Sequence, residues 1–252
     1  MASVPQVESR VPRGVQPLRA GQGNSFLLRR LHSLSGIVPV GAFLVEHFVS
    51  NAFATNGPTA YALQVKFLSG LPFRVWLETF GIFLPLAFHA LYGIYIWWRG
   101  ENNVVAYPWT GNWMYTLQRY TGMIAFAYII YHLYIMRFTG VELPQHPGAA
   151  FGKVQAEFAN GWPIAVYIIG IVTASWHFGY GLFLFAAKWG IVTGDKARKK
   201  MQIAGIGIAV LFMVIGMATM GAFFKYDRQP TDPAGALQIE KGTQPNPNPS
   251  SK

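Results

Sequence analysis

Four histidines lie inside long apolar stretches of the 252-residue chain: His47, His89, His132 and His177. A polar ring in hydrocarbon is costly, so such a residue normally faces the interior of a helix bundle and has a function there. An imidazole can ligate iron, or it can hydrogen-bond to a neighbouring helix. Both interpretations stay open for any one histidine taken alone, so their relative depths must decide between them.

Two of these histidines are expected at matching depths. At about 1.5 Å per helical residue, His89 lies about 15 Å before Arg99. His177 lies about 17 Å before Lys188 by the same count. We name His89 and His177 the inner pair, because the basic residues mark the expected cytoplasmic side.

The other two histidines lie farther from the basic ends. His47 is about 25 Å beyond Arg30, and His132 is about 20 Å beyond Arg119. We name them the outer pair. Two pairs at two depths, each drawn from two helices, match the geometry of two six-coordinate haems stacked across a bilayer, because each iron needs two opposed imidazoles.

The elements that must position these histidines are membrane spans. The sequence is 52% hydrophobic and 12% charged, and a spanning helix needs about 20 apolar residues. Five blocks approach or exceed that length: about 31–50, 74–98, 117–137, 162–187 and 202–224. We therefore predict an all-α integral membrane protein in which four helices form a haem-binding bundle beside a fifth helix. The expected parts are a cytoplasmic segment 1–25, a membrane domain 26–224 and an external, disordered tail 225–252.

The distribution of charge predicts the orientation. One side of the spans holds twelve basic residues: Arg10, Arg13, Arg19, Arg29, Arg30, Arg99, Arg119, Lys188, Lys196, Arg198, Lys199 and Lys200. The other side holds Lys66, Arg74, Arg137 and Lys153. The amino terminus is therefore expected in the cytoplasm and the carboxyl terminus outside. Membrane topology explains the net charge of +10 better than nucleic-acid binding does.

The absence of cysteine limits the cofactors. It excludes disulfides, thiolate zinc sites, iron–sulfur ligation and covalent haem attachment within this chain. A phosphate-binding fingerprint G-x-G-x-x-G is also absent, so neither a flavin nor a cluster is expected here.

The inner pair lies in a repeated pattern. "FHALYGIYIWWRG" at 88–100 and "WHFGYGLFLFAAKWG" at 176–190 share His-x-x-Tyr-Gly, which suggests a tandem pair of two-helix units. Four glycines lie at similar spacings from the four histidines in the two halves of the chain: Gly36, Gly93, Gly122 and Gly181. We expect them to clear space for flat macrocycles; the alternative is close helix packing in lipid.

The chain resembles a known family: the dihaem cytochrome b membrane anchors of succinate:menaquinone reductases and quinol:fumarate reductases, of the five-helix, single-anchor type. "RRLHSLSGIVPVGAFLVEHFVSN", "LPFRVWLETFGIFLPLAFHALYGIYI", "NWMYTLQRYTGMI" and the Trp176-His177-Phe178 region carry the resemblance, which covers about 26–224. It implies two b haems, the outer of lower potential on His47 and His132, the inner of higher potential on His89 and His177. The family's histidine matching His32 is not taken as a ligand.

The resemblance also implies partners and a place. A separate flavoprotein and a separate iron–sulfur protein would dock on the cytoplasmic face of a bacterial inner membrane and interconvert succinate and fumarate. This chain would be the non-catalytic subunit of that respiratory enzyme, passing electrons to menaquinone near the outside.

Residues that could serve a quinone are polar groups near the outer pair. Glu46 adjoins His47, Asn51 closes the first span, and Glu78 lies toward the outside of the second. For each, an ordinary interfacial role is the alternative. Likewise Arg29, Arg30 and Arg119 either pair with haem propionates or anchor the chain at the membrane surface. Pro85 is expected to distort the second span.

Two other functions stay open from the residues. One is a cytochrome b subunit of a hydrogenase or formate dehydrogenase. The other is a haem-free transporter or proton channel in which the histidines form a relay.

Overall fold

The structure is a computed structural model that describes residues 22–242, with side chains from residue 25 onward. All regular elements in this part of the chain are helical, and five of its helical segments are long and apolar enough to cross a membrane. The prediction of five spans is confirmed. They are α1 (Gln22–Ile37) with α2 (Pro39–Ala52); α4 (Arg74–Trp76), η2 (Leu77–Phe83) and α5 (Leu84–Arg99); α6 (Thr110–Leu133) with η3 (Tyr134–Phe138); α8 (Trp162–Lys188); and α9 (Asp195–Lys225).

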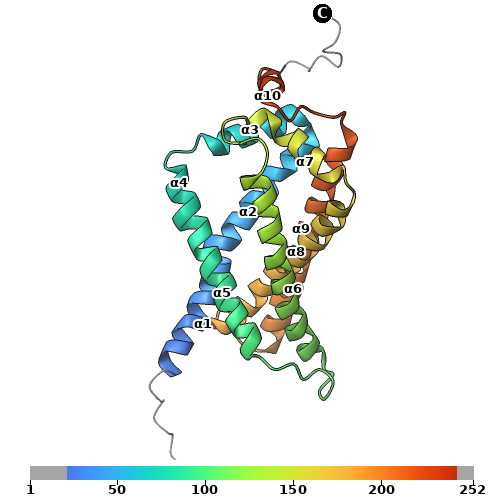
Figure 1. The fold of residues 1–252 in the computed structure, drawn as a ribbon. Coiled ribbons are helices and arrows are strands. Elements are labelled where there is room, and N and C mark those ends of the chain that lie inside the picture. Colours follow the sequence, from blue (N-terminus) through green and yellow to red (C-terminus); the bar gives the residue numbers. More distant parts are fainter. Residues whose placement is uncertain (1–21, 243–252) are drawn as a thin grey trace, which may run out of the picture.

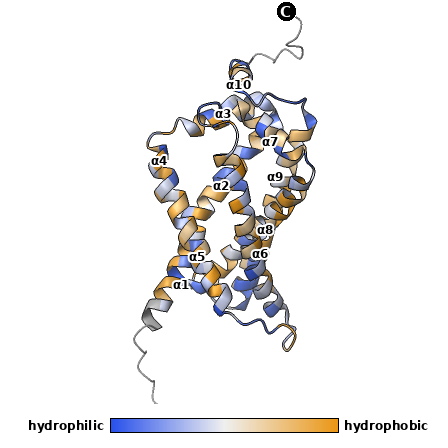
Figure 2. Cartoon of the chain, viewed as in Figure 1, coloured by the Kyte–Doolittle hydropathy of each residue, from blue (hydrophilic) through white to orange (hydrophobic). Residues whose placement is uncertain are grey.

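The two ends of the bundle differ (Figure 1). The loops at 100–109 and 189–194 lie at one end, which we call the basic end. The other end, which we call the capped end, carries three further helices: α3 (Pro58–Ser69), α7 (Ala150–Phe158) and α10 (Pro233–Glu240). Apolar residues dominate the middle of the bundle, and hydrophilic residues gather toward both ends (Figure 2).

Proline explains a local widening of the second span. The π-helical segment Leu77–Phe83 immediately precedes α5, in whose first turn Pro85 lies. Proline lacks the N–H that would bond one turn back and its ring clashes there, so the helix widens at this point. The predicted distortion is confirmed. A second π segment, η3, follows His132 at the capped end.

Glycines bring helices α8 and α9 close together. A Cβ on Gly179 would collide with the carbonyl oxygen of Gly205, and one on Gly216 would lie 2.6 Å from a methyl of Ile171. Small residues allow this approach, which dispersion forces reward in lipid. Helix α9 therefore packs closely against α8, which is one of the histidine-bearing helices.

The chain after α9 differs from the expected disordered tail. Residues 226–242 lie folded on the capped end and include α10, whereas 243–252 are outside the described residues. Gln155 of α7 holds this segment: its amide donates to the carbonyls of Phe223, Tyr226 and Asp227 at 3.0–3.2 Å, and its oxygen accepts from the Gln229 N–H at 2.8 Å. Composition alone suggested disorder after α9, but the buried amide of Gln155 provides hydrogen-bond partners for the backbone of this segment.

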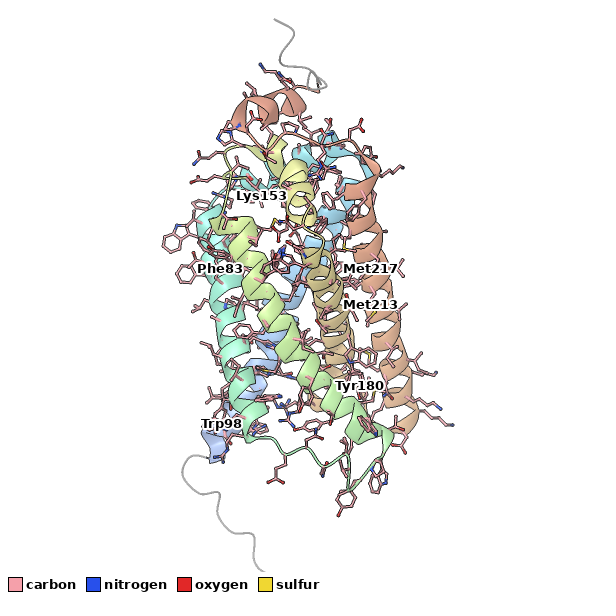
Figure 3. All side chains as sticks on the ribbon, turned by 45° about the vertical axis from the view of Figure 1, so that its right-hand side comes forward. Phe83, Trp98, Lys153, Tyr180, Met213 and Met217 are labelled. Atoms are coloured by element: carbon pink, nitrogen blue, oxygen red, sulfur yellow. The ribbon has the colours of Figure 1, made fainter. Side chains whose placement is uncertain are left out.

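A buried amine holds the capped end of the third span. Lys153 of α7 is 8% exposed, and its Nζ donates to three carbonyls, those of Met136, Thr139 and Val141, at 3.0, 2.6 and 3.2 Å. Met136 lies in the last turn of that span and Thr139 and Val141 follow it, so their carbonyls are at a helix end, where intrahelical donors run out. Burial lowers the pKa of Lys153. Figure 3 shows its place, at the opposite end of the bundle from Trp98.

We expect Lys153→Met to destabilise the protein, because it leaves these carbonyls buried without donors. At about 1–3 kcal/mol for each unpaired group, the free energy of unfolding should fall by roughly 3 kcal/mol, and the melting temperature in detergent by roughly 5–10 °C. The matched control is Lys66→Met, because the Lys66 side chain is 60% exposed and lies 4.0 Å from Glu240. Equal melting temperatures of the two variants would contradict the capping role.

Candidate haem and quinone sites

The outer pair meets between the first and third spans. His47 projects from α2 and His132 from α6, with ring centroids 5.7 Å apart and ring planes at 78°. The two residues are 85 positions apart in the sequence (132 − 47), so only the bundle brings them together.

The inner pair repeats this arrangement between the second and fourth spans. His89 projects from α5 and His177 from α8, with centroids 6.1 Å apart and planes again at 78°. The structure therefore brings together the same two pairs that the depths in the sequence predict.

The separation of each pair fits an iron between two imidazoles. With a metal–nitrogen bond of about 2 Å and about 1 Å more from each nitrogen to its ring centre, opposed imidazole centroids lie about 6 Å apart. Two imidazoles in direct stacking contact lie closer, as His32 and His89 do at 4.1 Å and 10°. Within residues 22–242, no group of three or more His, Cys, Asp or Glu side chains could hold a bare metal ion. The donor sets therefore suit the two axial positions of haem.

Both inner histidines bond to a backbone carbonyl of the neighbouring helix. Nδ1 of His89 lies 2.9 Å from the oxygen of His32, and Nδ1 of His177 lies 3.0 Å from that of Gln118. A carbonyl only accepts, so Nδ1 carries the proton in each ring. Nε2 is then unprotonated and available to a metal.

The outer histidines have side-chain partners instead. Nδ1 of His132 lies 3.2 Å from the hydroxyl of Tyr167. The Asn51 amide nitrogen lies 3.4 and 3.3 Å from the two nitrogens of His47, which places it over the ring face, and donates to the His47 carbonyl at 2.8 Å.

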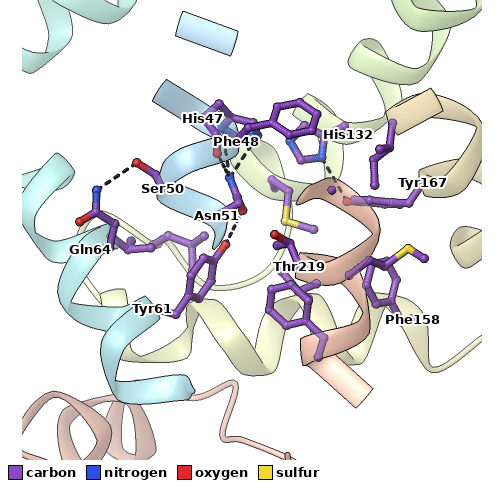
Figure 4. Close-up of a pocket in the computed structure, with 18 of the residues that line it drawn as sticks. His47, Phe48, Ser50, Asn51, Tyr61, Gln64, His132, Phe158, Tyr167 and Thr219 are labelled. Atoms are coloured by element: carbon purple, nitrogen blue, oxygen red, sulfur yellow. Dashed lines mark hydrogen bonds between the residues drawn. The ribbon is translucent and has the colours of Figure 1, made fainter. Parts of the chain in front are cut away.

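A cavity of about 240 Å³ lies beside the outer pair at the capped end (Figure 4). Most of its wall is apolar, from α2, α3, α6, α7, α8 and α9. Its polar lining residues are His47, Ser50, Asn51, Tyr61, Gln64, Tyr128, His132, Tyr167 and Thr219. A mostly apolar pocket with a few convergent polar groups is typical of a small-molecule site.

Two hydrogen-bonded chains reach this cavity. In one, Tyr61 donates to the Asn51 carbonyl oxygen at 2.9 Å. In the other, the Gln64 amide donates to the Ser50 hydroxyl at 3.0 Å, and that hydroxyl donates to the Glu46 carboxylate. Asn51 thus lines the cavity directly, whereas Glu46 reaches it through Ser50.

Glu78 lies in an ion-pair cluster instead. Its carboxylate is 2.9 Å from Arg137 and 3.4 Å from Arg74, and it is not among the residues that line the cavity. This cluster joins the second and third spans at their capped ends. Of the three predicted quinone residues, Asn51 therefore lines the cavity, Glu46 is linked to it by a hydrogen bond, and Glu78 does not line it.

The arginines at the basic end make contacts within the chain. Arg119 donates to the carbonyls of Trp97, Gly100 and Glu101, and so caps the end of α5. The guanidinium of Arg30 lies over the ring of Trp189 at 4.9 Å. Capping is a third role for Arg119, beside the two that the sequence suggests.

The sequence did not indicate several of the lining residues. Tyr61 and Gln64 lie in α3, a loop helix outside the five apolar blocks of the sequence. Tyr167 lies inside a span but is only one of several tyrosines there. The available signal was the Tyr-x-x-Gln spacing at 61–64, which places both side chains on one helical face.

A five-span helical bundle with two opposed histidine pairs has the architecture of a membrane-bound b-type cytochrome. Residues 102–216 match the family described as the succinate dehydrogenase/fumarate reductase transmembrane subunit. The chain is also 36% identical over 198 residues to the succinate dehydrogenase cytochrome b558 subunit of Bacillus subtilis, covering 79% of this chain and 96% of that protein. The chain therefore belongs to the cytochrome b membrane subunits of succinate dehydrogenases and fumarate reductases.

Fumarate reductase subunits are similar as well. The fumarate reductase cytochrome b subunit of Wolinella succinogenes is 26% identical over 241 residues, which is 87% of this chain and 90% of that protein. The corresponding subunit of Helicobacter pylori strain 26695 is 25% identical over 216 residues, or 77% and 79%. Membership of this family confirms the resemblance seen in the sequence, and it implies further subunits.

Proposed function

We propose that this chain carries electrons between a cytoplasmic iron–sulfur subunit and menaquinone through two b haems. His89 and His177 would hold the inner haem, and His47 and His132 the outer one. The two pairs of opposed imidazoles, 6.1 and 5.7 Å apart, are the observation that carries this proposal. Bound haems would supply one-electron transfer, which joins one-electron iron–sulfur clusters to a two-electron quinone.

The basic end faces the cytoplasm in this proposal. Its support is the positive-inside rule, because the basic residues gather at the ends of the loops on that side. The partner subunits would dock there, with residues 1–25 beside them, and the capped end would face outward. Most of residues 1–25 lie outside the described part of the chain.

The cavity beside the outer pair would take the quinone headgroup. Its apolar wall suits a naphthoquinone ring, and Asn51 and Tyr61 would orient the ring through its carbonyl oxygens. Protons would pass between the cavity and Glu46 through the Ser50 hydroxyl, which already links Gln64 to that carboxylate. Glu78 would hold two spans together through its arginines, so its quinone role stays a prediction from the sequence alone.

Haem quantitation and turnover of the purified complex test this proposal. We expect two b haems per chain, reduction of one haem by succinate, and electron exchange with menaquinone analogues. One haem or none per chain would contradict it. Absence of b-type absorbance would favour a haem-free transporter or proton channel. Co-purification with a hydrogenase or formate dehydrogenase would favour a cytochrome b subunit of that enzyme.

A further inference from the structure

Two glycines lie directly against the rings of the inner histidines. A Cβ on Gly36 of α1 would collide with the His89 ring, and a Cβ on Gly122 of α6 would lie 2.6 Å from Cε1 of His177. Real Cβ atoms do not approach other atoms so closely. The expected clearance is therefore present, and at these two positions an imidazole from the next helix lies in it.

Each glycine also lies four residues after a carbonyl that an inner histidine uses. His32 precedes Gly36 by four, and Gln118 precedes Gly122 by four. In an α-helix the N–H of residue i+4 bonds to the carbonyl of residue i, and these two oxygens also accept from the hydroxyls of Ser35 and Thr121 at 3.0 and 3.2 Å. The histidine ring can still approach each oxygen because the glycine places no side chain beside it.

The two other spaced glycines complete the same arrangement. A Cβ on Gly93, four residues after His89, would lie 3.2 Å from the His32 ring, and one on Gly181, four after His177, would lie 3.5 Å from the Gln118 amide nitrogen. Both helix pairs therefore place a glycine of each helix against a side chain of the other. The arrangement occurs twice, in α1 with α5 and in α6 with α8.

We propose that Gly36 and Gly122 are positioning residues for the inner haem ligands. Because each glycine has no side chain, the ring of the inner histidine on the neighbouring helix can lie against it. Nδ1 of that ring then donates to the carbonyl four residues before the glycine, and Nε2 faces the iron. This inference rests on the proposed haem ligation by His89 and His177. In the outer pair, Nδ1 of His132 lies 3.2 Å from the Tyr167 hydroxyl and the Asn51 amide lies over the His47 ring, so the two haems should respond differently to these glycines.

The test is Gly36→Ala and Gly122→Ala, each made separately in the full complex. A methyl group pushes the imidazole away from the carbonyl, so the Nδ1–H loses its acceptor and the ligand becomes less basic. We expect the inner haem either to be lost or to shift upward in midpoint potential with a changed ferric EPR signal. The outer haem should keep its potential and signal.

Two kinds of control distinguish the positioning of the inner histidines from the effect of alanine on helix propensity and from a general disruption of helix packing. Gly81→Ala and Gly111→Ala add a methyl with nothing within 4 Å, on helices of the same two pairs. Gly179→Ala produces a collision with Gly205 and Ala209 of α9 rather than with a histidine ring. These three variants should leave the potential and the EPR signal of the inner haem unchanged, even where Gly179→Ala lowers the melting temperature.

Wild-type protein labelled with ¹⁵N-histidine provides a measurement that needs no variant. Pulsed EPR of its inner haem should detect a protonated, strongly hydrogen-bonded remote nitrogen on both ligands. Unprotonated remote nitrogens, or an inner signal unchanged in both alanine variants, would overturn the inference while two haems persist. Retention of the inner signal in His89→Leu would instead overturn the proposed ligation itself, so the two failures are distinguishable.

Discussion

His132→Leu is expected to remove the lower-potential haem and to abolish menaquinone turnover, while succinate still reduces the higher-potential haem. The substitution deletes one imidazole of the outer pair and leaves the inner pair, which lies nearer the basic end, intact. Electron entry and soluble-dye reduction should therefore persist. Axial ligands govern haem potential, so the remaining haem should shift only modestly. Redox titration and quinone assays of the purified complex measure both effects.

His177→Leu is the matched variant, because it deletes one imidazole of the inner pair in the same way. It should remove the haem that succinate reduces and block electron entry to the remaining one. If His132→Leu removed the succinate-reducible haem and spared the other, the two pairs would be assigned to the wrong haems. Comparison of the two variants therefore tests the order of the haems as well as their ligands.

Asn51→Leu is expected to lower menaquinone turnover about 10- to 100-fold while both haems are retained. The amide of Asn51 donates to the His47 carbonyl, and its oxygen accepts from Tyr61, so leucine leaves the Tyr61 hydroxyl of the cavity without this partner. Loss of one such buried partner costs about 1–3 kcal/mol, and about 1.4 kcal/mol corresponds to a tenfold change in rate. Steady-state assays with a menaquinone analogue measure the change.

Asn56→Leu is the control for this prediction. Asn56 lies at the end of a short helical turn, is exposed, and lines no part of the cavity beside the outer pair. Its replacement should leave turnover and the affinity for quinone unchanged. Full turnover in Asn51→Leu would place the quinone elsewhere, and Glu78 would then be the next residue to test.

The spans and the pairing of the histidines could be predicted because both follow from one coordinate, the position along a helix. Apolar length sets where a helix crosses the bilayer, and the rise per residue sets the depth of each histidine. Pro85 could also be predicted, since the missing N–H acts within its own helix. None of these inferences requires knowing which helices are neighbours.

The cap could not be predicted in the same way. Helices α3, α7 and α10 have 12, 9 and 8 residues, and helices of this length are marginal in water without tertiary packing. Their stability comes from contacts such as those of Gln155 and Lys153, which are distant in sequence from their partners. Polar composition after Lys225 therefore suggested disorder.

The hydrogen-bond acceptors of the inner histidines could not be predicted from the sequence for another reason. The acceptors are backbone carbonyls of His32 and Gln118, and a backbone atom carries no signature in the sequence. The four-residue spacing to Gly36 and Gly122 was visible, but it could be interpreted only once the α1–α5 and α6–α8 contacts were known. His32 itself, which the resemblance does not make a ligand, stacks on His89.

The folded segment 226–242 has a practical consequence for experiments that attach reporters to this protein. Truncation at Lys225 would remove the Gln229 N–H from Gln155 and the Glu240 carboxylate from the Gly148 N–H, so a reporter joined there would loosen α7 and the loop before it. A topology reporter or affinity tag joined after residue 252 leaves these bonds in place. The same distinction applies to limited proteolysis at the capped end, where cleavage between α9 and α10 would separate α10 from the spans without cutting one of them.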